Sequence, residues 1–407
     1  MAGNTAAVFI RTNRWNARKI SFDQKGNEKM RIVFLSNFFN HHQSALSDAL
    51  WTQTGGKYSF VETSTMPQSR KALGYHVEQK PYVLRYQGNE EQVLKLIREA
   101  DVVLVGSTPE KLVRQRIRTG KLMFRYAEHP LKKGLEPWKY LPRLVRWHWR
   151  NPMRKPIYML CASAYTAGDY AKFGLFLDRT YKWGYFPETR WYENLEALWA
   201  EKDVAELLWC GRFLDWKHPD DAIMVARWLK NDGYAFRLNF IGRGEMEDAL
   251  RQMVQEYQLE DCVRFLGSMK PEEVREHMER AGIYLFTSDR QEGWGAVLNE
   301  SMNSGCAVVA SHAIGSVPFL IRDGENGLIY ESENVDMLYE KIKYLLNHPE
   351  KQKRLGMEAY ETITTEWNAE TAVERLMKLA AEISKRECKP LPFEEGPCSI
   401  AEIRKES

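Results

Sequence analysis

No hydrophobic run in the 407-residue chain approaches the roughly 18 residues that a membrane-spanning helix needs. The amino terminus also lacks a charged segment followed by a long apolar core, so we expect no secretion signal. Cysteine is scarce: six residues are scattered along the chain, and no C-x-x-C pair or Cys/His cluster indicates a zinc site. We therefore expect buried free thiols in a reducing cytosol rather than a disulfide framework.

The formal net charge is only +3, but this small value is the sum of two opposite halves. Residues 1–187 contain 31 basic and 14 acidic groups, which is +17, whereas the remaining residues contain 27 and 41, which is −14. Asymmetry of this size predicts that one half meets an anionic surface and that the other does not.

The chain is too long for one ordinary core and has the length of two domains. Short β-branched or aromatic runs alternate with helical patterns, which is typical of parallel sheets covered by helices. We therefore predict an α/β fold of two Rossmann-like, doubly wound parallel-sheet domains that face a cleft. The runs predicted as strands are 32–35, 102–105, 123–126, 157–160, 207–210, 238–241, 263–266, 283–287 and 307–310.

The same pattern sets the predicted domain boundaries. Residues 1–29 carry little pattern and are treated as an extension, and no internal repeat is found. Three prolines in the last segment, Pro390, Pro392 and Pro397, predict a poorly ordered tail. The predicted units are an amino-terminal domain at 30–187, a hinge at 188–204, a carboxy-terminal domain at 205–366, a helix at 367–386 that crosses back to the first domain, and a tail at 387–407.

Two glycine-containing turns in the second half follow predicted strands. In the first, Gly211 precedes two cations, Arg212 and Lys217, and a helix follows; cations beside free helix N–H groups suit a pyrophosphate. In the second, Gly242 and Gly244 allow close approach of a ligand, although the third glycine of the dinucleotide fingerprint is missing. Surface cations at a strand end and an ordinary tight turn remain the alternatives.

Two carboxylates stand eight residues apart, Glu292 in a loop and Glu300 in the next helix. Carboxylates accept hydrogen bonds from sugar and ribose hydroxyls, and the N–H groups of residues 293–296 suit phosphates. The alternative for the two glutamates is a helix cap and a solvated helix face.

These motifs together, with Phe265-Leu266-Gly267 and residues 323–328, resemble family 4 of the retaining glycosyltransferases over roughly residues 205–370. The resemblance implies a GT-B architecture in which the second domain holds a nucleotide-sugar donor and the first holds the acceptor. It also implies that Arg212 and Lys217 neutralise the diphosphate, that Glu292 contacts the donor sugar and that Glu300 binds the ribose. The full donor-binding set is Gly211, Arg212, Lys217, Gly242, Gly244, Glu292, Gly293, Trp294, Gly295, Ala296, Val297 and Glu300.

No cofactor and no metal is expected. The sequence has no Asp-x-Asp motif to hold a divalent ion, and two cations with helix dipoles can stabilise the charge that grows on a departing nucleoside diphosphate. The family implies retention of configuration, with same-face attack and proton transfer to the departing phosphate oxygen.

The sequence also departs from the family pattern. Pro318 stands where the family commonly has glutamate, and the glycine-rich loop after the first strand is absent. In its place are Asn40, His41, His42 and Gln43, which we expect on the acceptor or phosphate side of the cleft, with helix capping as the alternative. His129 follows a strand where the family often has a cleft histidine, so we count it with Glu292, Arg212 and Lys217 as catalytic; a structural histidine is the alternative.

Between Lys111 and Lys155 there are 14 basic residues and two acidic ones, Glu128 and Glu136. Cations interleaved with Trp and Leu are typical of a membrane-surface segment, so we predict a peripheral contact with an anionic membrane. A solvated cationic face remains open, and nucleic-acid binding is disfavoured because no known binding module accompanies the charge. The residues predicted to contact the membrane are Trp138, Arg143, Arg146, Trp147, Trp149 and Arg150.

We therefore predict a retaining, hexosyltransferase-type enzyme that transfers a sugar from a nucleotide-sugar donor to a glycan or lipid-linked acceptor. Its expected place is the cytoplasm, peripheral on the inner face of the membrane, in cell-surface polysaccharide or glycoconjugate synthesis. A nucleotide-sugar epimerase on the same fold and a non-catalytic, glycosyltransferase-like binding subunit are the alternatives.

Overall fold

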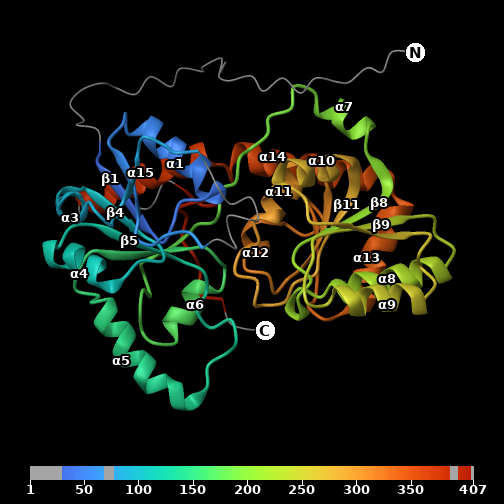
Figure 1. Ribbon diagram of the computed structural model, residues 1–407, viewed down its shortest axis with the longest axis horizontal. Coiled ribbons are helices and arrows are strands. Elements are labelled where there is room, and N and C mark those ends of the chain that lie inside the picture. The colour runs from blue at the N-terminus through green and yellow to red at the C-terminus, as the bar shows by residue number, and fades with distance from the viewer. Residues whose placement is uncertain (1–29, 68–77, 386–392, 405–407) are drawn as a thin grey trace.

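The computed structural model describes residues 30–67, 78–385 and 393–404, so the extension predicted at 1–29 lies outside the described residues. The described chain forms two α/β lobes side by side, each built on one parallel sheet (Figure 1). The predicted fold class, two doubly wound parallel-sheet domains, is confirmed.

The first lobe contains a seven-stranded sheet in the order β3-β2-β1-β4-β5-β6-β7, and all of its paired strands are parallel. Its central strands β1 and β4 are fully buried, because helices cover both faces of the sheet. The strands are β1 (Ile32–Ser36), β2 (Tyr58–Glu62), β3 (Val83–Arg85), β4 (Val102–Val105), β5 (Met123–Ala127), β6 (Ile157–Cys161) and β7 (Thr180–Lys182).

The second lobe repeats this plan with six parallel strands in the order β10-β9-β8-β11-β12-β13. In both sheets the strand order reverses beside the first strand, and crevices for ligands form at the carboxyl ends of such strands. The strands are β8 (Asp203–Cys210), β9 (Arg237–Ile241), β10 (Val263–Gly267), β11 (Ala281–Phe286), β12 (Ala307–Ser311) and β13 (Leu328–Tyr330).

Helices cover both sheets, and the last one returns to the first lobe. In Figure 1, α15 lies beside α1, and the Gln53 side chain donates a hydrogen bond to the carbonyl of Glu370 at 2.9 Å. The first lobe has α1 (His41–Gln53), α3 (Glu90–Glu99), α4 (Glu110–Thr119), α5 (Tyr140–Arg150) and α6 (Thr166–Ala171). The rest are α7 (Leu195–Ala200), α8 (Pro219–Asn231), α9 (Glu247–Glu256), α10 (Pro271–Arg280), α11 (Val297–Asn303), α12 (Val317–Leu320), α13 (Val335–Asn347), α14 (Pro349–Thr365) and α15 (Ala369–Lys385).

The carboxy-terminal tail is ordered where the structure describes it, so the prediction of a poorly ordered tail is wrong for residues 393–404. The backbone N–H of Cys398 donates to the carbonyl of Lys182 at 2.8 Å, and that of Ala401 donates to the carbonyl of Thr180 at 3.0 Å. Strand β7 is the last strand of its sheet and offers an unpaired edge, which the tail covers.

The five described cysteines, Cys161, Cys210, Cys262, Cys306 and Cys398, are free thiols, and all but Cys210 are buried; Cys388 lies outside the described residues. Among the described residues, no helix is both long and apolar enough to cross a membrane.

Candidate active site

The centre of the candidate site is an ion pair between Lys217 and Glu292. A 3₁₀ turn (Asp215–Lys217) after β8 carries the lysine, and the loop after β11 carries the glutamate. The Lys217 ammonium contacts Oε2 of Glu292, which also accepts a hydrogen bond from the Ser288 hydroxyl at 3.3 Å. Both charged side chains are largely buried, at 12% and 13% exposure. The structure thus joins two predicted catalytic residues at the carboxyl ends of neighbouring strands.

In the two glycine turns, Arg212 faces solvent, whereas Gly242 and Gly244 lie against neighbouring backbone. Arg212 is exposed, five residues before Lys217. A methyl group on Gly242 would overlap the carbonyl oxygen of Gly211, and one on Gly244 would overlap the backbone of Phe213. These glycines are therefore needed for the close approach of the β8 and β9 turns to each other, whatever else the turns bind.

The segment between the two predicted carboxylates packs against the first lobe. Trp294 is fully buried, and its indole N–H donates to Oδ1 of Asn299 at 2.8 Å. Its ring lies against Gly184, where any Cβ would overlap it, and 5.9 Å from the ring of Trp367. The prediction that Trp294 binds the donor is therefore wrong for its side chain, which is consumed in packing between the lobes. Gly295 has a φ of 76°, and a side chain there would overlap Phe286.

Glu300 lies on α11, which begins at Val297 with Ala296 at its amino-terminal cap. Burial raises the pKa of the Glu300 carboxyl, and the positive charges of Arg275 and Arg190 oppose that shift. The residue as a whole is of intermediate exposure.

The first lobe adds a carboxylate that the sequence analysis did not select as a site residue. Glu128, just after β5, accepts hydrogen bonds from the Tyr185 hydroxyl at 2.8 Å and from the Lys132 ammonium at 2.5 Å. A Cβ on Gly293 would overlap the Glu128 carboxylate, so this group lies directly against the loop that carries Glu292. Burial and the Glu128 charge raise the pKa of Tyr185 well above its ordinary value, which keeps the phenol protonated. The sequence signal that could have selected Glu128 was a carboxylate at the carboxyl end of the predicted strand 123–126.

His129 is 1% exposed and lies in the first lobe behind Glu128. Its Nδ1 is 3.5 Å from Oδ2 of Asp169, a buried carboxylate that accepts the Leu131 N–H at 2.8 Å and the Arg290 guanidinium of the second lobe at 3.1 Å. In the described part of the chain, neither ring nitrogen of His129 has a hydrogen-bond partner. His129 was expected to face an open cleft. Instead it is buried where the two lobes meet.

Residues 40–43 have two roles in the structure. Asn40 and Gln43 cap the amino terminus of α1, and the rings of His41 and His42 lie beside each other. Asn40 accepts from the His42 N–H at 3.0 Å, and the Gln43 side chain accepts from the Asn40 N–H at 3.2 Å, which is a capping box. The capping alternative therefore holds for Asn40 and Gln43. The rings of His41 and His42 are 3.9 Å apart, and His42 lies 6.4 Å from the ring of Tyr185. Burial lowers the pKa of His41, against the raising effect of Glu272 on α10.

The predicted membrane-contact residues all belong to α5 or to the turn before it (Pro137–Lys139). One of them is wrongly assigned: Trp147 is 7% exposed and lies 4.6 Å from Phe173 and 4.8 Å from Tyr170, ring to ring. Trp138 and Trp149 are exposed.

One group among the described residues could hold a cation: His218, Asp220 and Asp221, at the start of α8. Burial raises the pKa of Asp221 to about 6, although the His218 charge opposes this.

Comparison with known proteins places the Lys217–Glu292 pair within a described family. Residues 193–362 match the family model "Glycosyl transferases group 1". These residues make up most of the second lobe, which therefore resembles a glycosyl transferases group 1 domain. The matched residues run from the hinge to α14 and include Arg212, Lys217, Glu292 and Glu300.

Two relatives share this domain. An uncharacterized glycosyltransferase of Methanocaldococcus jannaschii is 30% identical over 191 residues, which is 47% of this chain and 52% of that protein. The amylovoran biosynthesis glycosyltransferase AmsK of Erwinia amylovora is 27% identical over 191 residues, which is 46% of this chain and 47% of the relative. The chain spans about half the length of the curated relatives it matches.

Solved structures resemble both lobes. HepE of Anabaena in complex with UDP has a TM-score of 0.66 at 15% identity, with 87% of this chain and 100% of that chain covered. TarM of S. aureus has a TM-score of 0.62 at 12% identity, with 86% and 98% covered. Because these similarities extend over the first lobe as well as the group 1 domain, the whole fold is GT-B.

Proposed function

We propose that this protein is a metal-independent, retaining glycosyltransferase that moves a sugar from a nucleotide-sugar donor to a glycan or lipid-linked acceptor in cell-surface polysaccharide or glycoconjugate synthesis. The observation that carries the proposal is the Lys217–Glu292 pair, which lies in a group 1 domain at the carboxyl ends of β8 and β11. Ligands of open α/β sheets bind at this edge.

The second lobe binds the donor. Glu292 neutralises Lys217 in the structure; a donor diphosphate would compete for the ammonium group and release the carboxylate for a sugar hydroxyl. Arg212, exposed in the same turn, adds the second charge. Glu300 accepts a ribose hydroxyl, and the backbone of residues 293–296 faces the phosphates.

The first lobe covers the sugar. A buried imidazole nitrogen without a hydrogen-bond partner is costly, and a sugar hydroxyl at His129 would remove that cost once the lobes part to admit the donor. Glu128 lies against Gly293 and is placed to accept from a hydroxyl of the donor or acceptor.

Negative charge grows on the diphosphate as the glycosidic bond breaks, and Lys217 and Arg212 stabilise it in the transition state. The departing phosphate oxygen takes the proton of the attacking acceptor hydroxyl on the same face of the sugar, so that configuration is retained and no side chain becomes a nucleophile.

The first test is thermal-shift screening with UDP-, GDP-, ADP- and dTDP-sugars, because ligands that bind the native state raise its melting temperature. UDP-glucose is the first donor to try, since HepE is described in complex with UDP-glucose and TarM in complex with UDP. We expect a shift with one nucleotide class and sugar transfer only when an acceptor is added. Isomerised sugar from donor alone would indicate an epimerase, and no shift with any donor would contradict the proposal.

A further inference from the structure

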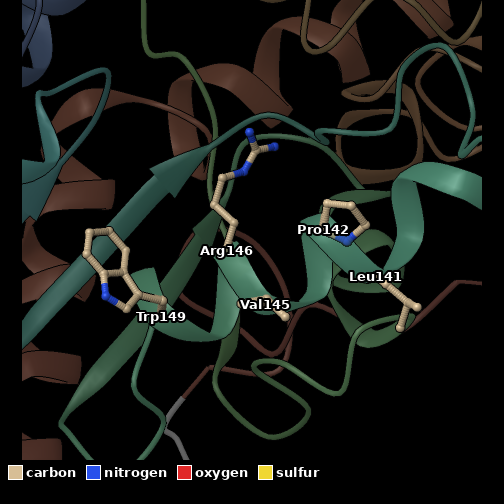
Figure 2. Close-up of a pocket in the computed structure, with 5 residues that line it drawn as sticks. All are labelled: Leu141, Pro142, Val145, Arg146 and Trp149. Atoms are coloured by element: carbon tan, nitrogen blue, oxygen red, sulfur yellow. The ribbon is translucent and has the colours of Figure 1, made fainter.

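The most exposed apolar surface of the described chain is a stripe on α5 and the turn before it. Its side chains are spaced three or four residues apart and therefore share one face of the helix. They are Trp138 at 71% exposure, Leu141 at 67%, Val145 at 69% and Trp149 at 59%. Figure 2 shows Leu141, Val145 and Trp149 standing out from α5, with Pro142 and Arg146 lining the same hollow.

The opposite face of α5 already anchors the helix to the lobe. Tyr140 stacks on Phe173 at 5.0 Å, and Trp147 packs on Phe173 and Tyr170. The exposed stripe therefore takes no part in holding α5 on the lobe. Soluble proteins rarely leave such a patch uncovered, so it indicates an interaction surface.

The charges around the stripe are mostly positive, and the acidic neighbour Glu136 is paired with Lys139 at 2.5 Å. Arg146 is exposed beside it, and the guanidinium of Arg114 lies over the ring of Trp149 at 3.1 Å. Two other cations of this region serve the fold instead: Arg116 is buried among backbone carbonyls, and Arg125 pairs with Glu110. The charge count for residues 111–155 includes Arg116 and Arg125, and the segment remains strongly basic without them.

We propose that α5 docks this protein on an anionic bilayer, with Leu141, Val145 and Trp149 in the headgroup region and the arginines on lipid phosphates. Apolar side chains flanked by cations match that interface, where rings and aliphatic groups enter while cations stay with the charged headgroups. A second copy of the same surface would bring two cationic faces together. Duplex nucleic acid would leave the aliphatic stripe without an apolar partner.

This contact places the membrane on the lobe that carries Glu128. Glu128, which lies against Gly293, is ten residues before Trp138, a distance of at most about 35 Å for an extended chain. Under the proposed function, a lipid-linked acceptor would therefore emerge from the bilayer on the side of the first lobe, within about 35 Å of Glu128.

The test is flotation of the full chain with vesicles of phosphatidylcholine, alone or with about one third phosphatidylglycerol, at low and high salt. We expect binding only to the anionic vesicles and release at high salt. Leu141→Ser with Val145→Ser, and separately Arg146→Glu, should each weaken binding about tenfold or more. All three positions are exposed, so thermal unfolding should stay unchanged. The matched controls are Trp191→Ser, at another exposed aromatic, and Lys95→Glu, at another exposed cation; both should bind as the parent does.

Absence of binding to anionic vesicles at low salt would overturn the proposal, as would equal binding by parent and α5 variants. Binding of duplex RNA without vesicle binding would assign the surface to nucleic acid, and an α5-dependent dimer without vesicle binding would assign it to a second copy. Flotation needs neither donor nor turnover, so its failure is distinct from failure of the proposed activity.

Discussion

Lys217 and Glu292 form an ion pair although 75 residues separate them in the sequence. Strands β8 and β11 are neighbours in the second sheet, and the turn after each strand delivers one partner. Each charge is largely buried, so either partner left alone would carry an uncompensated charge until a ligand arrives. Under the proposed function, the pair thus links the stability of the site to the binding of a diphosphate.

Replacing Lys217 by alanine should lower kcat by about 10²-fold or more, because the variant loses a charge that stabilises the departing diphosphate in the transition state. Glu292→Gln should lower kcat while leaving the nucleoside diphosphate bound, since the carboxylate is proposed to contact the sugar and not the phosphates. Steady-state kinetics and a thermal-shift titration with the nucleoside diphosphate measure the two effects.

The control for this pair is Arg251→Ala, which removes a half-exposed cation on α9 and should leave both measurements unchanged. Full turnover by Lys217→Ala would remove that residue from the mechanism, and full turnover by Glu292→Gln would remove the proposed sugar contact.

Most of the central strands could be predicted from the sequence, because strands buried on both faces are continuous apolar runs. The predicted runs 102–105 and 307–310 correspond to β4 and β12. Four strands that are not buried at every position were not predicted: β2, β3, β7 and β13. Pairing with a neighbour defines such strands, and composition does not report pairing.

In the candidate site, too, the sequence predicts single residues but not the contacts between them. Lys217 and Glu292 could be selected singly from motifs, but their contact depends on the order of β8 and β11. At the end of β5, His129 was predicted as a site residue and Glu128 was not. Neighbouring residues at a strand end point to opposite sides. Here Glu128 faces Gly293 and His129 faces Asp169, a choice that only the fold decides.

Gly293→Ala should displace the Glu128 carboxylate and the Lys132 ammonium, because the new methyl group would overlap both, and both are the ends of flexible side chains. We expect turnover to fall by about tenfold or more, on the scale of lost alignment in the site, while the nucleoside diphosphate still binds the second lobe. Steady-state kinetics and a thermal-shift titration with the nucleoside diphosphate measure the two effects. Glu128→Ala serves as the comparison and should lose turnover to a similar degree. Full turnover by Gly293→Ala would contradict the role proposed for Glu128.

Asp221 should make stability depend on pH. Burial raises its pKa to about 6 in the folded state, above the ordinary value of 3.8, so the folded protein holds this proton more tightly than the unfolded chain does. The contribution of Asp221 to the free energy of unfolding therefore falls as pH rises from about 4 to about 6. Above pH 6 the carboxylate is ionised in both states, and its destabilising effect stays constant. Relative to the parent, Asp221→Asn should gain on the order of 1 kcal/mol in unfolding free energy between pH 5 and pH 8.

Urea unfolding of both proteins across this pH range measures the difference. Asp336→Asn is the control, since Asp336 also lies in the first turn of a helix but is exposed. A difference between Asp221→Asn and the parent that does not change with pH would contradict the shifted pKa.

Cys398 reports whether the tail stays on the first lobe. Its thiol is fully buried, and burial raises its pKa above the ordinary value, so the reactive thiolate is scarce while the tail covers the β7 edge. We expect iodoacetamide to label Cys398 in the native protein far more slowly than in urea, as mass spectrometry would measure. Cys398→Ser should lower the unfolding free energy by about 1–3 kcal/mol and speed proteolysis of the tail, because it buries a hydroxyl that has no hydrogen-bond partner in place. Cys398→Ala, which adds no polar group, is the matched control. Rapid native labelling of Cys398 would show that the tail leaves the β7 edge readily, which would contradict a stable contact between residues 393–404 and the first lobe.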